Sequence, residues 1–366
     1  MAEIAVVAGE TSGDIHAANL VAALHRLDPG VRVWGVGGER LRAAGAEIVF
    51  PCEKLASMGL FESLGKLGAL REARAAMARR FAERRPALFL PVDFGGFNLA
   101  LAADAKRFSI PVCYYIPPKV WAWGAGRVEK VRCRVDRLLV TLPFEEPFWR
   151  GHGIPCEYVG SPVADHIALR SRDPEPDVVG LLPGSRMGEV SRIWPLLLAA
   201  ARIIGSRRKV RFLAPRAEGL PADCLDAGWN RGELDLTILP GSSQEVMERS
   251  RVCLVASGTA TLECALVGTP MVVVYRMNPV TMALARRLVK LSWASLPNLI
   301  ANREVVPECL QTGPAPVAEA ALELMEDGPR RSAMISGLAE VRAAVGGPCA
   351  SQRAAHAVSK YLKGNG

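Results

Sequence analysis

The sequence lacks the features that mark secreted and membrane-spanning chains. Its nine cysteines are odd in number and scattered, and they form neither the even set of a disulfide-rich domain nor the close pairs of a metal site. The first residues enter a strand-like apolar run directly, without a basic n-region or a cleavage site, and no apolar run approaches about 20 residues. We therefore expect a cytoplasmic protein with reduced thiols.

Motifs of several enzyme classes and of nucleic-acid binding are also absent. The chain contains no P-loop, no His/Glu metal cluster and no serine nucleophile elbow, which disfavours ATP hydrolysis, metal-dependent hydrolysis and acyl transfer. It has no recognition-helix, zinc-finger or aromatic RNA-binding pattern, so nucleic acid is not an expected partner. The formal charge of +8 instead favours phosphorylated small molecules or an anionic bilayer surface.

The arrangement of the apolar runs predicts two α/β domains. A chain of 366 residues exceeds the roughly 250 to 300 residues at which a single hydrophobic core stops growing. Short β-branched runs alternate with helix-compatible segments in two successive series, which is typical of parallel sheets in Rossmann-like domains. The expected strands are 4–7, 31–36, 88–92, 112–116 and 138–142 in the first series, and 178–182, 210–213, 234–239, 252–256 and 271–275 in the second.

The boundary between the domains is predicted from a stretch with turn-forming residues. Residues 158–176 carry Gly160 and three prolines among charged residues, the composition of an exposed linker. We therefore expect one domain at residues 1–165 and a second at 166–345. After a Gly-Gly-Pro break, a last helix within residues 346–366 is expected to pack back on the first domain.

The loop after the first expected strand carries two carboxylates. Small residues from Gly9 onward let the backbone approach a ligand, and a helix begins at once. Because Glu10 and Asp14 are themselves negative, this loop suits hydroxyl groups or a transferred proton better than a phosphate. The alternative is structural, since Ser12 or Asp14 can cap the helix.

One loop of the second domain has a charge suited to a diphosphate. Gly184, Ser185 and Arg186 follow the first strand of the second series and open a helix. Exposed amides at the helix start and a guanidinium on the same turn can bind a diphosphate. A structural ion pair between Arg186 and Glu189 is the alternative.

A second loop of this domain suits a nucleoside. Ser257, Thr259 and Thr261 form a hydroxyl-rich turn at the end of another strand, and Glu263 lies in the helix that follows. The hydroxyls can reach phosphates, and a carboxylate can accept both hydroxyls of a ribose. A buried capping role is the alternative for Glu263. Asn298, further along, offers amide donors and an acceptor to a ligand, or else it stabilises a turn.

One stretch of the first domain has the apolar-then-basic order of a bilayer-binding surface. Its apolar members are Leu55, Met58, Leu60, Phe61, Leu64, Leu67 and Leu70, and arginines follow from Arg71 to Arg85. This order suits an anionic membrane, and Trp121 and Trp123 would add side chains that favour the headgroup zone. The alternative is an ordinary helix with its leucines in the core and its arginines solvated.

Together these segments resemble the lipid-A-disaccharide synthase family. The resemblance rests on runs that occur in order from residue 1 to about residue 355. They include AGETSGDIHAANL from Ala8, PPKVWAWGAGRV from Pro117, LLPGSRMGEV from Leu181, SGTATLECAL from Ser257, VVYRMNP from Val273 and SLPNLIANREVVPE from Ser295. Several of these runs are specific to the family rather than to its fold.

The resemblance implies a GT-B fold, with the acceptor bound mainly by the first domain and the uridine nucleotide by the second. It implies an inverting transfer in which UDP-2,3-diacylglucosamine and 2,3-diacylglucosamine 1-phosphate give a β-1,6-linked lipid A disaccharide 1-phosphate and UDP. Arg186, Glu263 and Asn298 match positions that the family uses around the nucleotide, and Arg276 in the VVYRMNP run is a further nucleotide-binding candidate. No metal or other cofactor is implied, since the UDP-sugar is a substrate. The protein is expected to associate peripherally with the inner membrane, and a homodimer is an open alternative to a monomer.

One departure from the family's pattern leaves open which residue acts as the general base. Many members carry an Asp-Xaa-Pro-Asp-Phe-Asn segment whose second Asp is the expected base, whereas the segment from Asp93 to Asn98 reads DFGGFN and has Gly96 there. Asp93 follows a strand at the ligand edge of the sheet, and Glu10 and Asp14 compete with it as the base. Asp93 can alternatively cap the Gly-rich turn. A UDP-sugar 2-epimerase of the same fold and a catalytically silent nucleotide-binding homologue are the other functions left open.

Overall fold

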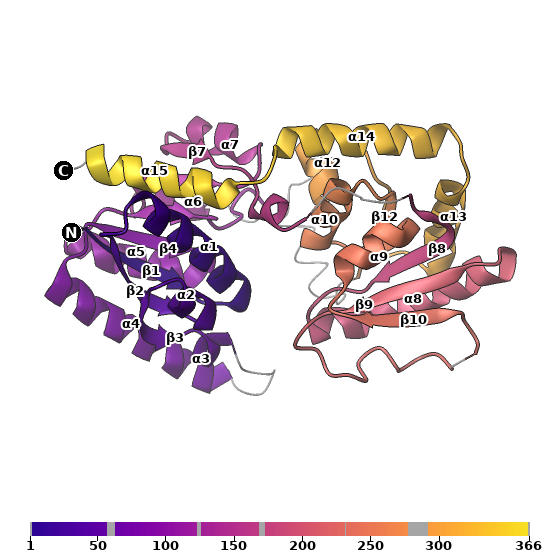
Figure 1. Ribbon diagram of the computed structural model, residues 1–366, viewed down its shortest axis with the longest axis horizontal. Helices are drawn as coiled ribbons and strands as arrows, with labels where there is room; N and C mark the ends of the chain where they lie inside the picture. Colours follow the sequence, from indigo (N-terminus) through magenta and orange to yellow (C-terminus); the bar gives the residue numbers. More distant parts are fainter. Residues whose placement is uncertain are drawn as a thin grey trace. The chain divides into compact units, whose positions relative to one another are not determined.

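The computed structural model of the protein describes residues 2–56, 63–122, 126–167, 173–230, 232–276 and 292–364. The chain divides into two compact units, each built around a parallel sheet (Figure 1). Unit 1 comprises Met1–Asp165 and Pro348–Gly366, and unit 2 comprises His166–Gly347. The predicted α/β class with two Rossmann-like sheets is confirmed.

Unit 1 contains a seven-stranded sheet in the order β3-β2-β1-β4-β5-β6-β7, with all strand pairs parallel. The strands are β1 (Glu3–Ala8), β2 (Arg32–Gly37), β3 (Glu47–Pro51), β4 (Leu88–Val92), β5 (Cys113–Tyr115), β6 (Arg137–Val140) and β7 (Cys156–Tyr158). The helices are α1 (Thr11–Leu27), α2 (Glu39–Ala43), α3 (Glu53–Ala56), α4 (Ser63–Arg84), α5 (Gly95–Arg107), α6 (Gly126–Arg132), α7 (Glu145–Gly151), the 3-10 helix η1 (Pro162–Asp165) and α15 (Ala350–Gly364). The chain order reverses between β1 and β4, so the loops after these strands flank the crevice where such sheets bind ligands.

The strand residues of unit 1 alternate between two apolar layers. Ala5 and Val7 of β1 belong to the layer that includes Phe81 of α4, whereas Ile4 and Val6 belong to the layer shared with α1 and α15. Successive side chains of a strand point to opposite faces of the sheet, which explains this division. Because both faces are buried, the central strands are continuous apolar runs, and this made them predictable from the sequence.

Helix α15 returns to unit 1 and completes its second apolar layer. It packs against α1 (Figure 1), and Ala354 and Val358 are fully buried in that layer. The Asp165 carboxylate caps the helix, since it accepts hydrogen bonds from the backbone N–H groups of Ala350 (2.8 Å) and Ser351 (3.0 Å). The expected packing of the C-terminal helix on the first domain is therefore confirmed.

Unit 2 contains a six-stranded parallel sheet in the order β10-β9-β8-β11-β12-β13. The strands are β8 (Glu175–Leu182), β9 (Arg211–Arg216), β10 (Leu236–Pro240), β11 (Ser250–Ala256), β12 (Met271–Tyr275) and β13 (Glu308–Leu310). The helices are α8 (Met187–Arg207), α9 (Ser243–Arg249), α10 (Thr259–Val267), α12 (Leu296–Ala301), α13 (Pro314–Met325) and α14 (Pro329–Val345). The order reverses between β8 and β11, so the loops after these two strands hold the ligand-binding position of unit 2.

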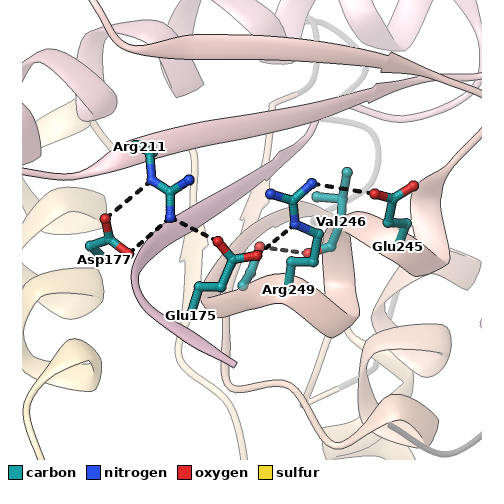
Figure 2. A network of polar contacts seen from close by, with 7 residues as sticks. Glu175, Asp177, Arg211, Glu245, Val246 and Arg249 are labelled. Carbon is teal, nitrogen blue, oxygen red and sulfur yellow. Dashed lines mark hydrogen bonds and ion pairs between the residues drawn. The ribbon is translucent and has the colours of Figure 1, made fainter. Parts of the chain in front are cut away.

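An ion network ties together the amino ends of two central strands of unit 2 (Figure 2). Arg211 of β9 donates hydrogen bonds to Glu175 (2.7 Å) and Asp177 (3.1 Å) of β8, and Arg249 of α9 donates to Glu175 (2.7 Å). The bond from Arg249, with a further one from Arg211, lowers the pKa of the Glu175 carboxyl. The network lies at the end of the sheet opposite the ligand-binding loops, so we assign it to the stability of the sheet.

Candidate active site

Asp14 of α1 has a structural task in unit 1. Its side chain is 4% exposed, and its carboxylate accepts hydrogen bonds from the backbone N–H groups of Gly38 (2.6 Å), Arg40 (3.1 Å) and Leu41 (3.3 Å). These donors belong to the start of α2, so Asp14 caps α2 rather than its own helix. Because the carboxylate is committed to backbone donors, we assign Asp14 to the fold, which corrects the expectation that it competes as the general base.

The loops after β1 and β4 pack directly against each other. A Cβ atom on Gly9 would lie 2.2 Å from the Phe94 ring, so only glycine leaves room for that ring. Glu10 follows Gly9 as the half-buried N-cap residue of α1, and Asp93 precedes Phe94 after β4. Two candidate bases, Glu10 and Asp93, therefore stand on adjoining loops at the switch point of the sheet.

Asp93 is half-buried, and its backbone is held by three hydrogen bonds. Its N–H donates to the Tyr115 carbonyl (3.1 Å), and its carbonyl accepts from the Tyr114 hydroxyl (2.6 Å) and the Asn98 amide (2.7 Å). Gly96 lies close by, exposed in the first turn of α5, and no heavy atom outside its chain neighbours and its own helix backbone stands within 4 Å of where its Cβ would be. Position 96 therefore has room for a side chain.

A buried carboxylate of unit 1, Glu145 at the start of α7, was missed in the sequence analysis. It is 2% exposed and accepts hydrogen bonds from the Trp121 indole (2.9 Å) and from the backbone N–H groups of Thr141 (3.1 Å) and Leu142 (3.0 Å). Burial raises the pKa of its carboxyl. The one available signal was a Glu just after a strand and a turn, where an acidic side chain can satisfy free backbone donors.

Trp121, predicted to contact a membrane, is half-buried in unit 1. Its indole N–H is bonded to Glu145, and its ring meets Phe144 edge-to-face with 4.9 Å between the ring centroids. Side chains tied at both the polar and the apolar end keep one orientation. We therefore treat Trp121 as a fixed part of the loop after β5.

The apolar-then-basic stretch of unit 1 is only partly a surface feature. Leu55 is buried and Leu70 packs against the core, whereas Leu67 is 46% exposed. Arg74 and Arg84 form ion pairs with carboxylates of unit 1, so these two arginines are not simply solvated. Met58, Leu60, Phe61, Trp123 and the side chain of Leu64 lie outside the described residues. In the part of the chain that the structure describes, no helix combines the length and the apolar character needed to span a bilayer.

The loop after β8 in unit 2 is shaped by Gly184 and Glu189. Gly184 has φ of 107°, and a Cβ atom there would lie 2.1 Å from the Glu189 carboxylate, so the position requires glycine. Burial raises the pKa of Glu189, while the Ser185 backbone and the Arg186 charge act in the opposite direction. Ser185 and Arg186 are exposed at the start of α8, where backbone amides and positive charge can meet an anion.

The loop after β11 offers fewer free hydroxyls than expected. The Ser257 hydroxyl donates to the Ala294 carbonyl (2.9 Å), and the buried Thr261 hydroxyl donates to the Gly258 carbonyl (2.8 Å). Both hydroxyls are therefore engaged within unit 2, which corrects the expectation that Thr261 reaches a phosphate. Thr259 is exposed at the first position of α10 and keeps that role as a candidate.

Glu263 and Arg276 are the other candidate ligand groups of unit 2. Glu263 lies half-buried in the second turn of α10, and burial raises the pKa of its carboxyl. Arg276 is exposed directly after β12, the strand next to β11. A carboxylate can accept hydrogen bonds from hydroxyls, and a guanidinium can pair with phosphate. Among the described residues, no group of three or more His, Cys, Asp or Glu side chains is placed to hold a metal ion.

Asn298 is a structural residue of unit 2, contrary to the expectation that it contacts the nucleotide. Its amide oxygen accepts from the N–H groups of Val305 (2.7 Å) and Val306 (2.9 Å), and its nitrogen donates to the Val306 carbonyl (2.9 Å) and to Glu308 (2.8 Å). The fully buried amide is thereby used inside the unit. Glu308, which the sequence analysis missed, also accepts from the Ser295 N–H (2.8 Å) and hydroxyl (2.6 Å) and anchors the start of α12.

Two Rossmann-like units, each with candidate ligand groups at its switch point, form the architecture of the GT-B fold. The calicheamicin glycosyltransferase CalG4 aligns with a TM-score of 0.64 and 17% identity over 99% of this chain and 98% of its own. MurG of Acinetobacter baumannii aligns with a TM-score of 0.63 and 14% identity over 98% of this chain and all of its own (100%). These similarities establish the shared fold.

Sequence similarity narrows the class to one family. The family model described as lipid-A-disaccharide synthetase matches residues 4–355. The lipid-A-disaccharide synthase of Anaeromyxobacter sp. (strain K) is 41% identical over 99% of this chain and 98% of its own length. That of Myxococcus xanthus (strain DK1622) is 39% identical over 98% of this chain and 97% of its own. The chain belongs to the lipid-A-disaccharide synthase family and is therefore a glycosyltransferase. This membership rules out the alternative that it is a UDP-sugar 2-epimerase.

Proposed function

We propose that the protein transfers 2,3-diacylglucosamine from its UDP derivative to 2,3-diacylglucosamine 1-phosphate. The acceptor 6-hydroxyl oxygen attacks the anomeric carbon, the bond from that carbon to UDP breaks, and UDP leaves with the electron pair. The hydroxyl proton passes to a carboxylate of unit 1. The observation that carries the proposal is the family match over nearly the whole chain, with the polar loops placed at both switch points.

In this proposal unit 2 binds the nucleotide and stabilises the leaving UDP. Arg186, Thr259 and Arg276 would contact the phosphates, and the starts of α8 and α10 would add backbone donors. Glu263 would accept the ribose hydroxyls. The UDP-sugar is a substrate, and the positive groups named here replace the metal ion that other glycosyl transfers require, so no cofactor enters the scheme.

The direct test is turnover by the purified protein. With UDP-2,3-diacylglucosamine and 2,3-diacylglucosamine 1-phosphate in the presence of EDTA, disaccharide 1-phosphate and UDP should form in equal amounts. A protein that binds UDP but forms neither product would be the silent homologue. Turnover that appears only after a divalent metal is restored would contradict the cofactor-free scheme.

The ribose assignment predicts a selective loss of nucleotide affinity in Glu263→Gln. UDP affinity should fall about 10-fold, because the amide accepts fewer hydrogen bonds than the carboxylate, while pyrophosphate affinity stays unchanged. Calorimetric titration with both ligands measures this. Glu319→Gln, an exposed carboxylate of α13, is the control and should bind UDP as the wild type does. An equal loss for both ligands in Glu263→Gln would assign Glu263 to the fold.

We also propose that unit 1 contacts the inner-membrane surface from the cytoplasm, since both substrates are acylated. Leu67 of α4 is 46% exposed beside exposed arginines and would insert into the bilayer. Leu67→Asp should therefore lower binding to anionic vesicles about 10-fold without changing UDP affinity. Vesicle co-sedimentation measures the effect. Ile335→Asp, at a side chain 43% exposed in unit 2, is the matched control, and an equal loss in both variants would argue against a specific contact by α4.

A further inference from the structure

The backbone of unit 1 is strained at the candidate base. Asp93 has φ of 51° and Phe94 has φ of 52°, so two successive residues with side chains adopt the left-handed conformation. This conformation is unfavourable for residues other than glycine, and Phe is poorly suited to it. Such strain persists only where neighbouring groups hold the backbone in place, and it concentrates at functional sites.

Two buried side chains converge on the carbonyl oxygen of Asp93. The Tyr114 hydroxyl donates to it at 2.6 Å and the Asn98 amide nitrogen at 2.7 Å. The same nitrogen lies 3.2 Å from the Val92 carbonyl and 3.3 Å from the Val7 carbonyl. One amide therefore joins the ends of β1 and β4, the two strands that flank the switch point.

Asn98 and Tyr114 are buried polar residues whose hydrogen bonds are directed at the Asp93 backbone. Asn98 and Tyr114 are fully buried, and burying an amide or a hydroxyl is costly unless each polar atom is bonded. The amide oxygen of Asn98 has no hydrogen-bond partner among the described residues. Apolar side chains of similar size would leave the Asp93 carbonyl without these two donors. The two polar side chains thus fix the Asp93 carbonyl in place.

We propose that Tyr114 and Asn98 are positioning residues for proton transfer. By holding the Asp93 carbonyl they set the backbone angles of Asp93 and hence the direction of its carboxylate. The inference rests on the proposed function, in which that carboxylate receives the proton of the acceptor hydroxyl. Proton transfer requires the base within hydrogen-bond reach, and a displacement of about 1 Å is enough to slow such a step strongly.

The first test removes only the Tyr114 hydroxyl. Tyr114→Phe should lower kcat about 10-fold and leave the KM of both substrates unchanged, because binding groups are untouched while the base is less well aligned. Tyr115→Phe is the matched control: this tyrosine is the next residue on β5, equally buried, and belongs to the opposite apolar layer. Its kcat should equal that of the wild type. An unchanged kcat in Tyr114→Phe, or an equal fall in both variants, overturns the inference.

The second test asks whether Tyr114 acts through Asp93. In an Asp93→Asn background, Tyr114→Phe should cause no further fall in kcat, because the group that it positions no longer acts as a base. Asn98→Ala, which removes the other donor, should show the same dependence on Asp93 and gives an independent measurement. If the effects multiply, the positioning role is wrong while Asp93 stands as the base. If Asp93→Asn alone keeps more than about a tenth of wild-type turnover, the base assignment fails first and the positioning role falls with it.

Discussion

Asp93→Asn should lower kcat by about 10² to 10⁴-fold, with UDP affinity and melting temperature nearly unchanged. An inverting transfer needs a carboxylate that takes the acceptor proton as the glycosidic bond forms, and Asn cannot accept that proton. Asp93 stands at the switch point of unit 1, its backbone is held by three hydrogen bonds, and its side chain is half-buried. Steady-state kinetics, UDP titration and thermal unfolding together measure the effect.

Variants of two other carboxylates of unit 1 serve as controls for this prediction. Asp14→Asn should lower the melting temperature instead, because it disturbs the cap of α2. Glu10→Gln should keep most of its turnover if Asp93 is the base. Should Asp93→Asn retain more than about a tenth of wild-type turnover, the role passes to Glu10.

A companion variant places a carboxylate at position 96. Gly96→Asp has open space for its side chain in the first turn of α5 and is expected to fold normally. Combined with Asp93→Asn, it should recover part of the lost turnover, because position 96 lies on the same loop and helix start as Asp93. Recovery would show that the base can act from either place.

Arg186→Ala should weaken UDP binding by about 10- to 100-fold, or roughly 1.5–3 kcal/mol, without unfolding the protein. Arg186 is exposed at the N-cap position of α8, where its positive charge adds to that of the helix N-terminus. Its removal therefore takes away a charge-assisted bond to the diphosphate and leaves the core of unit 2 intact.

Calorimetric titration with UDP and with uridine separates the contribution of the phosphates to the lost affinity from that of the nucleoside. Uridine, which lacks phosphates, should bind Arg186→Ala and the wild type alike. Arg207→Ala, at the far end of the same helix, is the control and should leave UDP affinity unchanged. Wild-type UDP affinity in Arg186→Ala would remove Arg186 from the nucleotide site.

The sequence predicted the interior strands of both sheets better than their edges. β1, β4 and β11 are buried on both faces and therefore appear as uninterrupted apolar runs. β3, β7 and β13 were not predicted. They are edge strands of only 5, 3 and 3 residues, and each contains a glutamate, so no apolar run of strand length marks them.

The candidate site was predictable where it depended on strand ends and unpredictable where it depended on distant partners. Glu10, Asp93 and Arg186 follow predicted strands, so their placement at the ligand edges came from topology alone. Asp14 and Asn298 were also predicted to act in the site, yet their side chains accept hydrogen bonds from backbone groups of other segments. No local pattern tells which carboxylate or amide finds such a partner, because the partner is set by the fold.

The return of α15 to unit 1 also sets an order of events during synthesis. A chain leaves the ribosome at roughly 5–20 residues per second, N-terminus first. All of unit 2 must be translated between Asp165 and the helix that covers α1. Until then the apolar surface that Ala354 and Val358 later bury faces water, whereas unit 2 is continuous and can fold as soon as it has emerged. The nascent protein thus offers chaperones an unfinished first domain until α15 has been translated.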